Sequence, residues 1–387
     1  MSILSEEVLH EKEIRLKKID KMMADLGLDA ILCTSTSQMS YQVHVKYIAK
    51  MTLQTRRAFV FKEIDKEPAL FLPMSVSKDT FYNRSWIEKE NLYLGNMLPN
   101  VLACIEKLPQ QKPRIGWATP DEIPHDIYNV LTGTKAEFVD ITKEFTIVRA
   151  NKSEYEIKMT QLSSDLAVAS FEDLIRRIEV GKTEIELLGG AIGFLAEHGA
   201  EEQLLLAQSK KPFSFIKMPQ DVPLTETDIF VYSAEFGGPG GYWTQLIRPI
   251  FMDKKTHLDA YEIWKAVLEA EQAAVDVMHP GNRVCDIHFA IEAVINKYGM
   301  RMSYWAGHGM GADLGDGVDI GPENNMIIVP NMVLTLQPSI DSDTNSILYG
   351  NTFLSRETGE AINLTGKYMD TPYYEDLYNM IVNGAKA

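Results

Sequence analysis

The sequence has few cysteines, little positive charge and no long apolar run. Its three cysteines, Cys33, Cys104 and Cys285, are far apart and form no Cys-x-x-Cys pair, so neither a disulfide framework nor a zinc site is indicated. A net charge of -16 argues against binding to nucleic acid phosphates or to an anionic membrane surface. No apolar run approaches a membrane span, and the N-terminus lacks the basic and apolar parts of a signal peptide. These absences predict a cytoplasmic protein that binds neither nucleic acid nor membrane.

The order of helix and strand patterns predicts two domains in an α/β (α+β) protein. The 387 residues are enough for two cores, and 45% hydrophobic residues is ordinary for a globular chain. In the first domain, residues 1–145, a helix capped by Ser5 ends at Gly27 and precedes a buried strand. That strand is expected at 29–34, further strands at 57–61 and 68–73, and helices near 97–108 and 126–131.

The second predicted domain covers residues 146–387. Ser153 is followed three residues later by Glu156, the spacing of a capping box at a helix N-terminus. We expect helices at 155–180, 182–198, 257–279 and 284–298, and strands within 228–251. No repeat of fixed short period is visible.

Three segments of the second domain resemble the pita-bread family, which includes aminopeptidase P, prolidase, methionine aminopeptidase and creatinase. They are residues 228–248, 307–311 and 329–338. In the metal-binding members these segments, with a strand near the C-terminus, supply two Asp, one His and two Glu around a pair of divalent ions. The resemblance implies the pita-bread fold for residues 146–387 and a creatinase/prolidase-type domain for residues 1–145.

Only one of the five ligands is found at its family position in this chain. The matching positions hold Ser233, Gln245, His308, Gln337 and Gly350. Paired divalent ions need anionic oxygens to offset their charge, and hydroxyls and amides bind such ions far more weakly than carboxylates. We therefore expect no metal centre and no cofactor.

His308 is the strongest candidate for a catalytic group. It stands between glycines, where the backbone can present a side chain rather than pack it, although a lone histidine is usually structural. Without a metal it can act as general acid, general base or hydrogen-bond donor. Glu235 is the other group in this region that could accept a proton.

Creatinase works without metal and is the natural comparison within the family. Its guanidinium-binding glutamates would fall on Ile247 and Gln337, which disfavours creatine itself as the substrate. The proline-directed peptidases carry an additional His shortly after the Gly-His-Gly, where this chain has Gly315, and another before the first strand. Peptidase activity is disfavoured on both counts.

The predicted pocket combines amide and hydroxyl groups with an aromatic wall, which suits a small polar or zwitterionic molecule. For Tyr242 and Trp243 the alternative is that they only pack within the strands. For Gln245 and Gln337 it is neutral drift in an active site that is no longer used. The binding residues are Ser233, Tyr242, Trp243, Gln245 and Gln337, beside Glu235, His308 and Lys217.

Arg56 and Arg57 precede an apolar strand of the first domain. In creatinase the corresponding region reaches the partner subunit's site, so the resemblance implies a homodimer in which these arginines meet the substrate. The alternative is that Arg56 and Arg57 simply lie at the solvated edge of a strand.

Three hypotheses of function remain open. The first is a metal-independent, creatinase-like hydrolase that cleaves a C–N bond of a small nitrogenous compound, with His308 as acid or base. The second is a non-catalytic relative that binds a small ligand or a protein. The third is an Xaa-Pro-type metallopeptidase.

Overall fold

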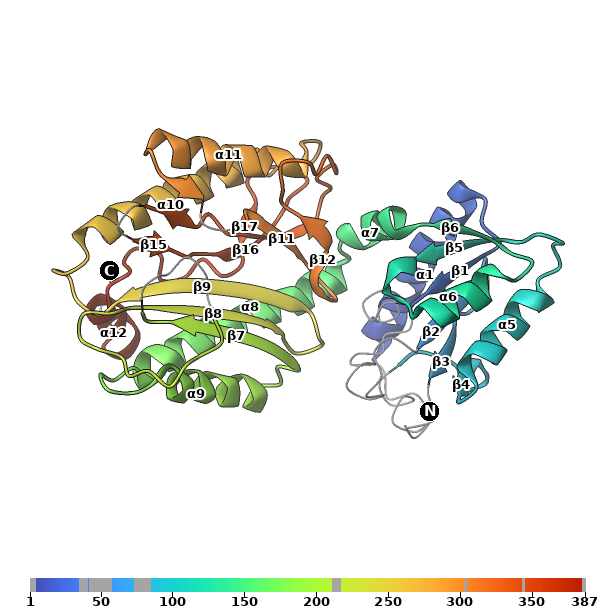
Figure 1. The fold of residues 1–387 in the computed structure, drawn as a ribbon, viewed down its shortest axis with the longest axis horizontal. Helices are drawn as coiled ribbons and strands as arrows, with labels where there is room; N and C mark the ends of the chain where they lie inside the picture. The colour runs from blue at the N-terminus through green and yellow to red at the C-terminus, as the bar shows by residue number, and fades with distance from the viewer. Residues whose placement is uncertain are drawn as a thin grey trace. The chain divides into compact units, whose positions relative to one another are not determined.

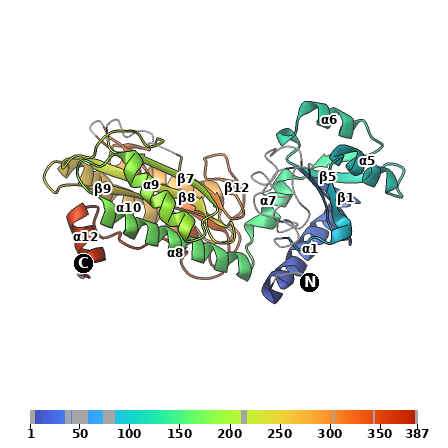
Figure 2. The same ribbon diagram turned by 90° about the horizontal axis from the view of Figure 1, so that it is seen from below.

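The computed structural model describes residues 5–34, 41, 58–72, 85–210, 217–302, 305–342 and 345–384. The chain divides into two compact units, Met1–Arg149 and Ala150–Ala387, drawn in Figures 1 and 2. The predicted domain boundary after residue 145 falls within helix α7 (Thr142–Ala150) and remains a prediction. Arg56 and Arg57 lie outside the described residues.

Unit 1 contains a six-stranded mixed sheet in the order β4-β3-β2-β1-β5-β6. β1 pairs antiparallel with β2 and parallel with β5. The strands are β1 (Ala30–Cys33), β2 (Phe59–Glu63), β3 (Ala69–Leu72), β4 (Leu92–Leu94), β5 (Arg114–Ala118) and β6 (Glu137–Asp140).

Helices cover both faces of this sheet because alternate side chains of β1 enter different cores. Ile31 and Cys33 pack in the cluster that holds buried residues of α1 and α7, whereas Leu32 packs with those of α5 and α6. The helices are α1 (Glu6–Leu26), α5 (Met97–Lys107), α6 (His125–Thr132) and α7, with 3-10 turns at Lys89–Asn91 and Pro120–Glu122. As predicted, the Ser5 side chain caps α1, and Gly27 ends it in the left-handed conformation, at φ 61°.

Unit 2 begins with a layer of two helices on a three-stranded antiparallel sheet. Figure 2 shows α8 and α9 lying across this sheet, which has the order β7-β8-β9. The predicted capping box of Ser153 and Glu156 is present at the start of α8. The elements are α8 (Glu154–Arg177), α9 (Glu184–Glu197), β7 (Glu202–Gln208), β8 (Ile229–Gly237) and β9 (Trp243–Phe251).

The other half of unit 2 contains two further sheets, with strand orders β12-β11-β13-β16-β17 and β10-β14-β15. The helices of this half are α10 (Leu258–Val277) and α11 (Val284–Lys297), whereas α12 (Tyr374–Val382) packs through Leu377 in the apolar cluster of α8 and α9. The strands are β10 (Arg301–Met302), β11 (Gly307–Met310), β12 (Leu314–Asp319), β13 (Val333–Leu336), β14 (Ile340–Asp341), β15 (Ser346–Ile347), β16 (Asn351–Leu354) and β17 (Ile362–Asn363).

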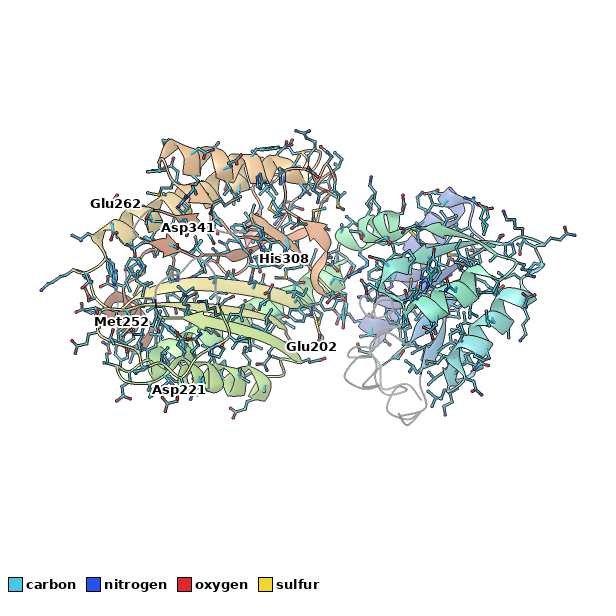
Figure 3. All side chains as sticks on the ribbon, in the orientation of Figure 1. Glu202, Asp221, Met252, Glu262, His308 and Asp341 are labelled. Atoms are coloured by element: carbon cyan, nitrogen blue, oxygen red, sulfur yellow. The ribbon has the colours of Figure 1, made fainter. Side chains whose placement is uncertain are left out.

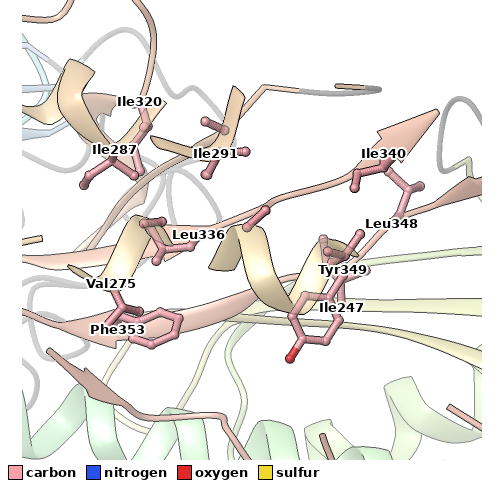
Figure 4. Close-up of a cluster of buried hydrophobic side chains, with 14 of the residues drawn as sticks. Ile247, Val275, Ile287, Ile291, Ile320, Leu336, Ile340, Leu348, Tyr349 and Phe353 are labelled. Carbon is pink, nitrogen blue, oxygen red and sulfur yellow. The ribbon is translucent and has the colours of Figure 1, made fainter. Parts of the chain in front are cut away.

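A large apolar cluster joins α10 and α11 to the inner strands of unit 2 (Figure 4). Ile247 of β9 belongs to it, and its backbone forms a bridge with Gly350, just before β16. The sheet of β7 to β9 and the five-stranded sheet therefore meet at β9 and β16. Within the described ranges, no helix combines the length and apolar character that a membrane crossing requires.

Candidate functional site

Four buried polar side chains from four segments of unit 2 come together around His308, which is labelled in Figure 3. His308 Nε2 lies 3.2 Å from Glu235 Oε1. It lies 3.5 Å from Gln337 Nε2. Gln337 Nε2 in turn donates a hydrogen bond to Gln245 Oε1. The structure thus brings together both predicted catalytic residues and both predicted binding glutamines.

Strand pairing explains why Glu235 belongs to this group. β8 alternates, so that Phe230, Tyr232, Ala234 and Phe236 pack toward α8 and α9, and the odd-numbered residues face the other way. On that inner face Glu235 stands directly opposite Gln245 of β9, whereas Ser233 stands opposite Ile247. The sequence comparison assigned Ser233 to the first ligand position and found no anion at any of the five. In the structure the Glu235 carboxylate, which was predicted as a catalytic group, is the anion that lies beside Gln245 and His308.

Close approach of two strands places His308. Gly307 has φ 136°, and a Cβ there would lie 1.9 Å from the Thr335 carbonyl oxygen, so only glycine lets β11 pair with β13 in this register. The β11–β12 pairing shifts register directly after His308, an irregularity that re-aims side chains. His308 Nδ1 lies 3.1 Å from the Gly309 carbonyl oxygen. A carbonyl can only accept, so Nδ1 carries a proton and Nε2 faces Glu235 and Gln337.

The backbones of the two glutamines are also fixed. The Thr352 hydroxyl accepts from the Gln245 amide at 3.0 Å and donates to the Gln245 carbonyl at 2.9 Å, which ties β9 to β16 at this residue. The Gln337 amide donates to the Ala306 carbonyl at 2.8 Å. Three hydrogen bonds, two with the Thr352 hydroxyl and one between backbones, therefore hold the main chain of Gln245 and Gln337.

Gly350, the position of the family's last glutamate, borders the same place. A Cβ at residue 350 would lie 3.4 Å from Gln337 Cγ and 3.3 Å from Ile247 Cδ1. A side chain there would therefore touch the methylenes of Gln337. In this chain Gln337 takes up the space beside Gly350.

The aromatic wall differs from the one predicted. Trp243 is buried in a small cluster with Met310, Val333, Leu354 and Leu364, which favours the packing alternative for this residue. The Tyr242 ring is buried and lies edge-on to Tyr155, with ring centroids 6.3 Å apart.

Trp305 is the aromatic residue beside the imidazole, and the sequence reasoning missed it. Its ring centroid lies 5.3 Å from that of His308, and the side chain is 46% exposed. The signal that could have found it is its position three residues before His308. Lys217, also considered for the pocket, is exposed, and its backbone pairs with Ala207.

Behind the site, a second polar network surrounds the buried carboxyl of Glu271 on α10. Asn351 Nδ2 donates to Glu271 at 2.7 Å, and Arg248 Nη2 donates to Asn351 Oδ1 at 2.7 Å. Arg248 also donates to the carbonyls of Ile247 and Gly350, which supports the junction of β9 and β16. Burial raises the pKa of Glu271 to about 7, although the Asn351 hydrogen bond and the Arg248 charge oppose the rise.

The donor set at the site does not fit a pair of divalent ions. One carboxylate, one imidazole and two amides carry a single formal negative charge, whereas the family site has four carboxylates. Within the part of the chain that the structure describes, no three His, Cys, Asp or Glu side chains gather in a way that could hold a metal ion. The absence of a functional metal remains a prediction.

Comparisons with known sequences identify the family. The profile of "Metallopeptidase family M24" matches residues 158–358, just over half of the chain. A relative from Bacillus subtilis (strain 168) is 24% identical over 245 residues. An uncharacterized peptidase of Staphylococcus aureus (strain USA300) is 26% identical over 208 residues, 52% of this chain and 59% of that protein. These alignments span 59–64% of the length of the two relatives.

Comparisons with solved structures concern nearly the whole chain. The prolidase from Pyrococcus horikoshii OT3 superposes with a TM-score of 0.75 at 19% identity, covering 91% of this chain and 97% of that one. The Xaa-Pro dipeptidase from Bacillus anthracis gives a TM-score of 0.75 at 17% identity, and the match covers 93% of this chain and 99% of that one. Together with the sequence profile they confirm the predicted fold, a mixed α/β protein with the two-domain architecture of the pita-bread family.

Proposed function

The chain belongs to metallopeptidase family M24, and from that premise we propose that it is a hydrolase that cleaves the C–N bond of a small amide, with Glu235 and His308 at the reacting centre. The observation that carries this proposal is the distance of 3.2 Å between His308 Nε2 and Glu235 Oε1 in a buried site. The matched relatives support an amide of the Xaa-Pro dipeptide class, because prolidases and an Xaa-Pro dipeptidase are among them. The substrate class of the third hypothesis, which was an Xaa-Pro-type metallopeptidase, fits the relatives described above better than a creatinase-like compound does.

The hydrolytic step follows from the orientation of the imidazole. With its proton on Nδ1 held by the Gly309 carbonyl, His308 offers the Nε2 lone pair to a water molecule. The water oxygen bonds to the amide carbon, Nε2 takes the proton, and the C–N bond breaks as that proton passes to the departing nitrogen. An acid and an amine result. Glu235 lies where a carboxylate compensates the positive charge of the protonated imidazole.

Metal independence is part of the proposal and rests on the donor set. Glu235 is the carboxylate that contacts His308, and Gln245 and Gln337 bring amides where a dinuclear site needs anions. No step of the mechanism above uses a metal ion. A cytoplasmic location likewise remains a proposal.

A second candidate is a binding protein without catalysis. The observation that favours it is the hydrogen bond that the Gln337 amide donates to the Gln245 amide oxygen, because it engages groups that a catalytic site would offer to substrate. Such a protein would bind the same small amides and release them unchanged.

The test is a screen of L-Xaa-L-Pro dipeptides, other dipeptides, and small guanidino, betaine and N-acyl amino acid compounds, read by mass spectrometry in the presence of a chelator. We expect cleavage of at least one Xaa-Pro dipeptide. His308→Ala should lower turnover by about 10²–10⁴-fold, whereas the exposed His198→Ala should leave it unchanged. Binding without turnover would favour the second candidate, and turnover unchanged in His308→Ala would refute the mechanism.

We also propose the homodimer that the creatinase resemblance implies. Light scattering at micromolar concentration should give twice the mass of one chain, and a monomer would remove Arg56 and Arg57 from any partner's site.

A further inference from the structure

The hairpin of β11 and β12 (Figure 1) is irregular directly beside His308. Gly309 pairs with Gly315, but His308, one residue earlier, pairs with Asp319. Residues 316–318 therefore form a bulge in β12, opposite the step from His308 to Gly309. Bulges change the direction of neighbouring side chains and are frequent next to active sites. What holds this bulge in place therefore bears on the direction of the imidazole.

The bulge begins in a backbone conformation that has to be held. Gly315, Asp316 and Gly317 have φ values of 78°, 40° and 75°. Glycine adopts such left-handed values freely, whereas a residue with a side chain does so at a cost in free energy, and aspartate is among the more tolerant. The two glycines alone would leave the chain free to adopt other conformations. The side chain of Asp316 is therefore the place where this conformation can be fixed.

Asp316 forms an ion pair with Lys152, and the two side chains are only 3% and 2% exposed. Lys152 directly precedes the capping box of α8, and its amide donates to the Asn331 carbonyl at 3.3 Å. Gly311 leaves room for the pair, because a Cβ there would overlap the Asp316 carboxylate and would lie 2.6 Å from Lys152 Nζ. The Gly311 carbonyl accepts from the Trp243 amide at 2.7 Å, which fixes the turn on its other side.

An ion pair buried to this extent is a poor source of stability. Taking both charges out of water costs about as much free energy as their attraction returns, and apolar replacements are often equally stable. The best attested use of such a pair is to select one arrangement of the chain over others. Here the arrangement that depends on Asp316 and Lys152 is the bulge of β12.

The bulge reaches His308 through Val318 and Gly309. Val318 is 4% exposed and packs in the large apolar cluster of α10 and α11. A Cβ on Gly309 would lie 3.0 Å from the Val318 Cβ, so the Gly309 backbone lies against the bulge. The Gly309 carbonyl oxygen is in turn the atom 3.1 Å from His308 Nδ1. If the bulge moved, this carbonyl would move, and the imidazole would lose the contact that keeps its proton on Nδ1.

We propose that Lys152 and Asp316 are positioning residues for His308. Their ion pair holds the bulge of β12, and the bulge holds the Gly309 carbonyl that leaves Nε2 of the imidazole facing Glu235. Neither residue of the pair has to touch the substrate. The inference rests on the proposed function for its effect on turnover, whereas its effect on the imidazole exists without any substrate.

The first measurement follows the imidazole directly. In protein labelled with ¹⁵N at its eight histidines, two-bond NMR spectra distinguish the two tautomers, and the signals missing from His308→Ala identify this residue. In the wild type we expect the proton on Nδ1. Asp316→Asn keeps the size of the side chain and its tolerance of left-handed backbone but removes the charge. In that variant the His308 signals should move toward the tautomer mixture of free histidine.

The second measurement is turnover of an Xaa-Pro dipeptide with chelator present. Asp316→Asn should lower kcat by about 10–100-fold, because a small misplacement of a catalytic group has effects of this size. KM should change little, since neither residue of the ion pair has to contact the substrate. A purely structural role would lower the urea midpoint of unfolding and leave both kcat and the His308 tautomer of the folded protein as they are.

Further variants separate the loss of the ion pair from a general loss of stability. If Asp316→Asn prevents folding because Lys152 is left as an uncompensated buried charge, Lys152→Met/Asp316→Asn removes that charge and carries the same expectations. The matched control is Asp20→Asn, which takes the partner from Lys62, a fully buried lysine of unit 1. Lys62→Met is added where the double variant is used. The control should lower stability without changing the His308 signals or kcat.

Several outcomes would overturn the proposal. They are unchanged His308 signals in the folded Asp316→Asn or double variant, an unchanged kcat, an effect confined to KM, or the same shift of the His308 signals in the Asp20→Asn control. Shifted His308 signals in a protein that cleaves none of the screened amides would support the positioning role and refute the proposed hydrolase. Cleavage by the wild type, with neither the signals nor kcat altered in the Asp316 variant, would do the reverse.

Discussion

Glu235 and His308 lie 3.2 Å apart at Oε1 and Nε2, on strands that come from opposite halves of unit 2. The contact is between a carboxylate oxygen that has no hydrogen-bond partner among the described residues and an imidazole whose other nitrogen lies against the Gly309 carbonyl. Two groups in direct contact in a buried site act as a unit, so the effect of changing one depends on the presence of the other.

We predict that the effects of changing these two residues are not additive. A double-mutant cycle with Glu235→Gln and His308→Ala should show a coupling free energy of about 0.5–3 kcal/mol, calculated from the kcat/KM values for any dipeptide that is cleaved. Once His308 is absent there is no imidazole for Glu235 to compensate, so loss of the Glu235 charge should lower kcat/KM little further. Strictly additive effects would mean that the two residues act separately, contrary to the mechanism proposed.

Metal content gives the second prediction. The wild-type protein should retain well under one transition metal ion per chain after dialysis, because its site offers one carboxylate and one imidazole as strong ligands. The double variant Gln245→Asp/Gln337→Glu adds two carboxylates beside them and should bind Mn²⁺ or Co²⁺ at least about tenfold more tightly.

The control for the metal experiment is Gln161→Asp/Gln272→Glu, which adds the same charge on the outer helices α8 and α10 and should not bind the ions. Elemental analysis and calorimetry decide the matter. One or two ions per wild-type chain, with activity lost to a chelator, would contradict the prediction and show that the activity depends on a metal ion.

Local signals in the sequence predicted local structure well. The Ser5 cap, the Gly27 stop and the Ser153–Glu156 capping box depend only on residues a few positions apart, and all three are present. The two-domain α/β architecture was also predictable, because the family's motifs occur in order along the chain. Strand β5 escaped prediction because Gly116 interrupts its short apolar run.

The site was predictable residue by residue but not as an arrangement. His308, Gln245 and Gln337 followed from the motifs, whereas the place of Glu235 beside Gln245 depends on the register of the β8–β9 hairpin. A shift of two residues exchanges Ser233 for Glu235 on the same face, and the spacing of motifs does not fix it. Trp305 stands only three residues before His308, and that spacing was the one local signal for the contact between the two rings.

The third prediction concerns stability against pH through Glu271. Burial raises the pKa of this carboxyl from 4.5 to about 7 in the folded protein. A group whose folded pKa is raised contributes stability that is fully present below its unfolded pKa, here near pH 4.5, and lost as the pH rises through about 7. At pH 8 the buried anion therefore costs the folded state about 3 kcal/mol.

Glu271→Gln should remove this dependence. The variant should match the wild type in urea unfolding near pH 4.5 and exceed it by up to about 3 kcal/mol at pH 8. Glu262→Gln, an exposed change on the same helix that breaks only the ion pair with Lys265, should leave the pH profile unaltered. Parallel profiles of wild type and Glu271→Gln would show that folding does not raise the pKa of Glu271.

The last prediction tests the close approach that places His308. In Gly307→Ala the added Cβ would lie 1.9 Å from the Thr335 carbonyl oxygen, at a φ of 136° that alanine rarely adopts. Because both atoms belong to paired backbones, the strands have to separate, and we expect a loss of roughly 2–4 kcal/mol in the free energy of unfolding. His308 moves with its strand, so turnover of any dipeptide that is cleaved should fall as well.

Gly189→Ala is the matched control, because Gly189 lies within α9 and a Cβ there meets nothing within 4 Å. Alanine is the better helix former, so this variant should gain about 0.5–1 kcal/mol. Urea unfolding of the two variants side by side separates the effect of adding a methyl group from the effect of adding it between β11 and β13. A Gly307→Ala protein as stable as the wild type would mean that the two strands do not approach as closely as described, and that the position of His308 does not depend on this glycine.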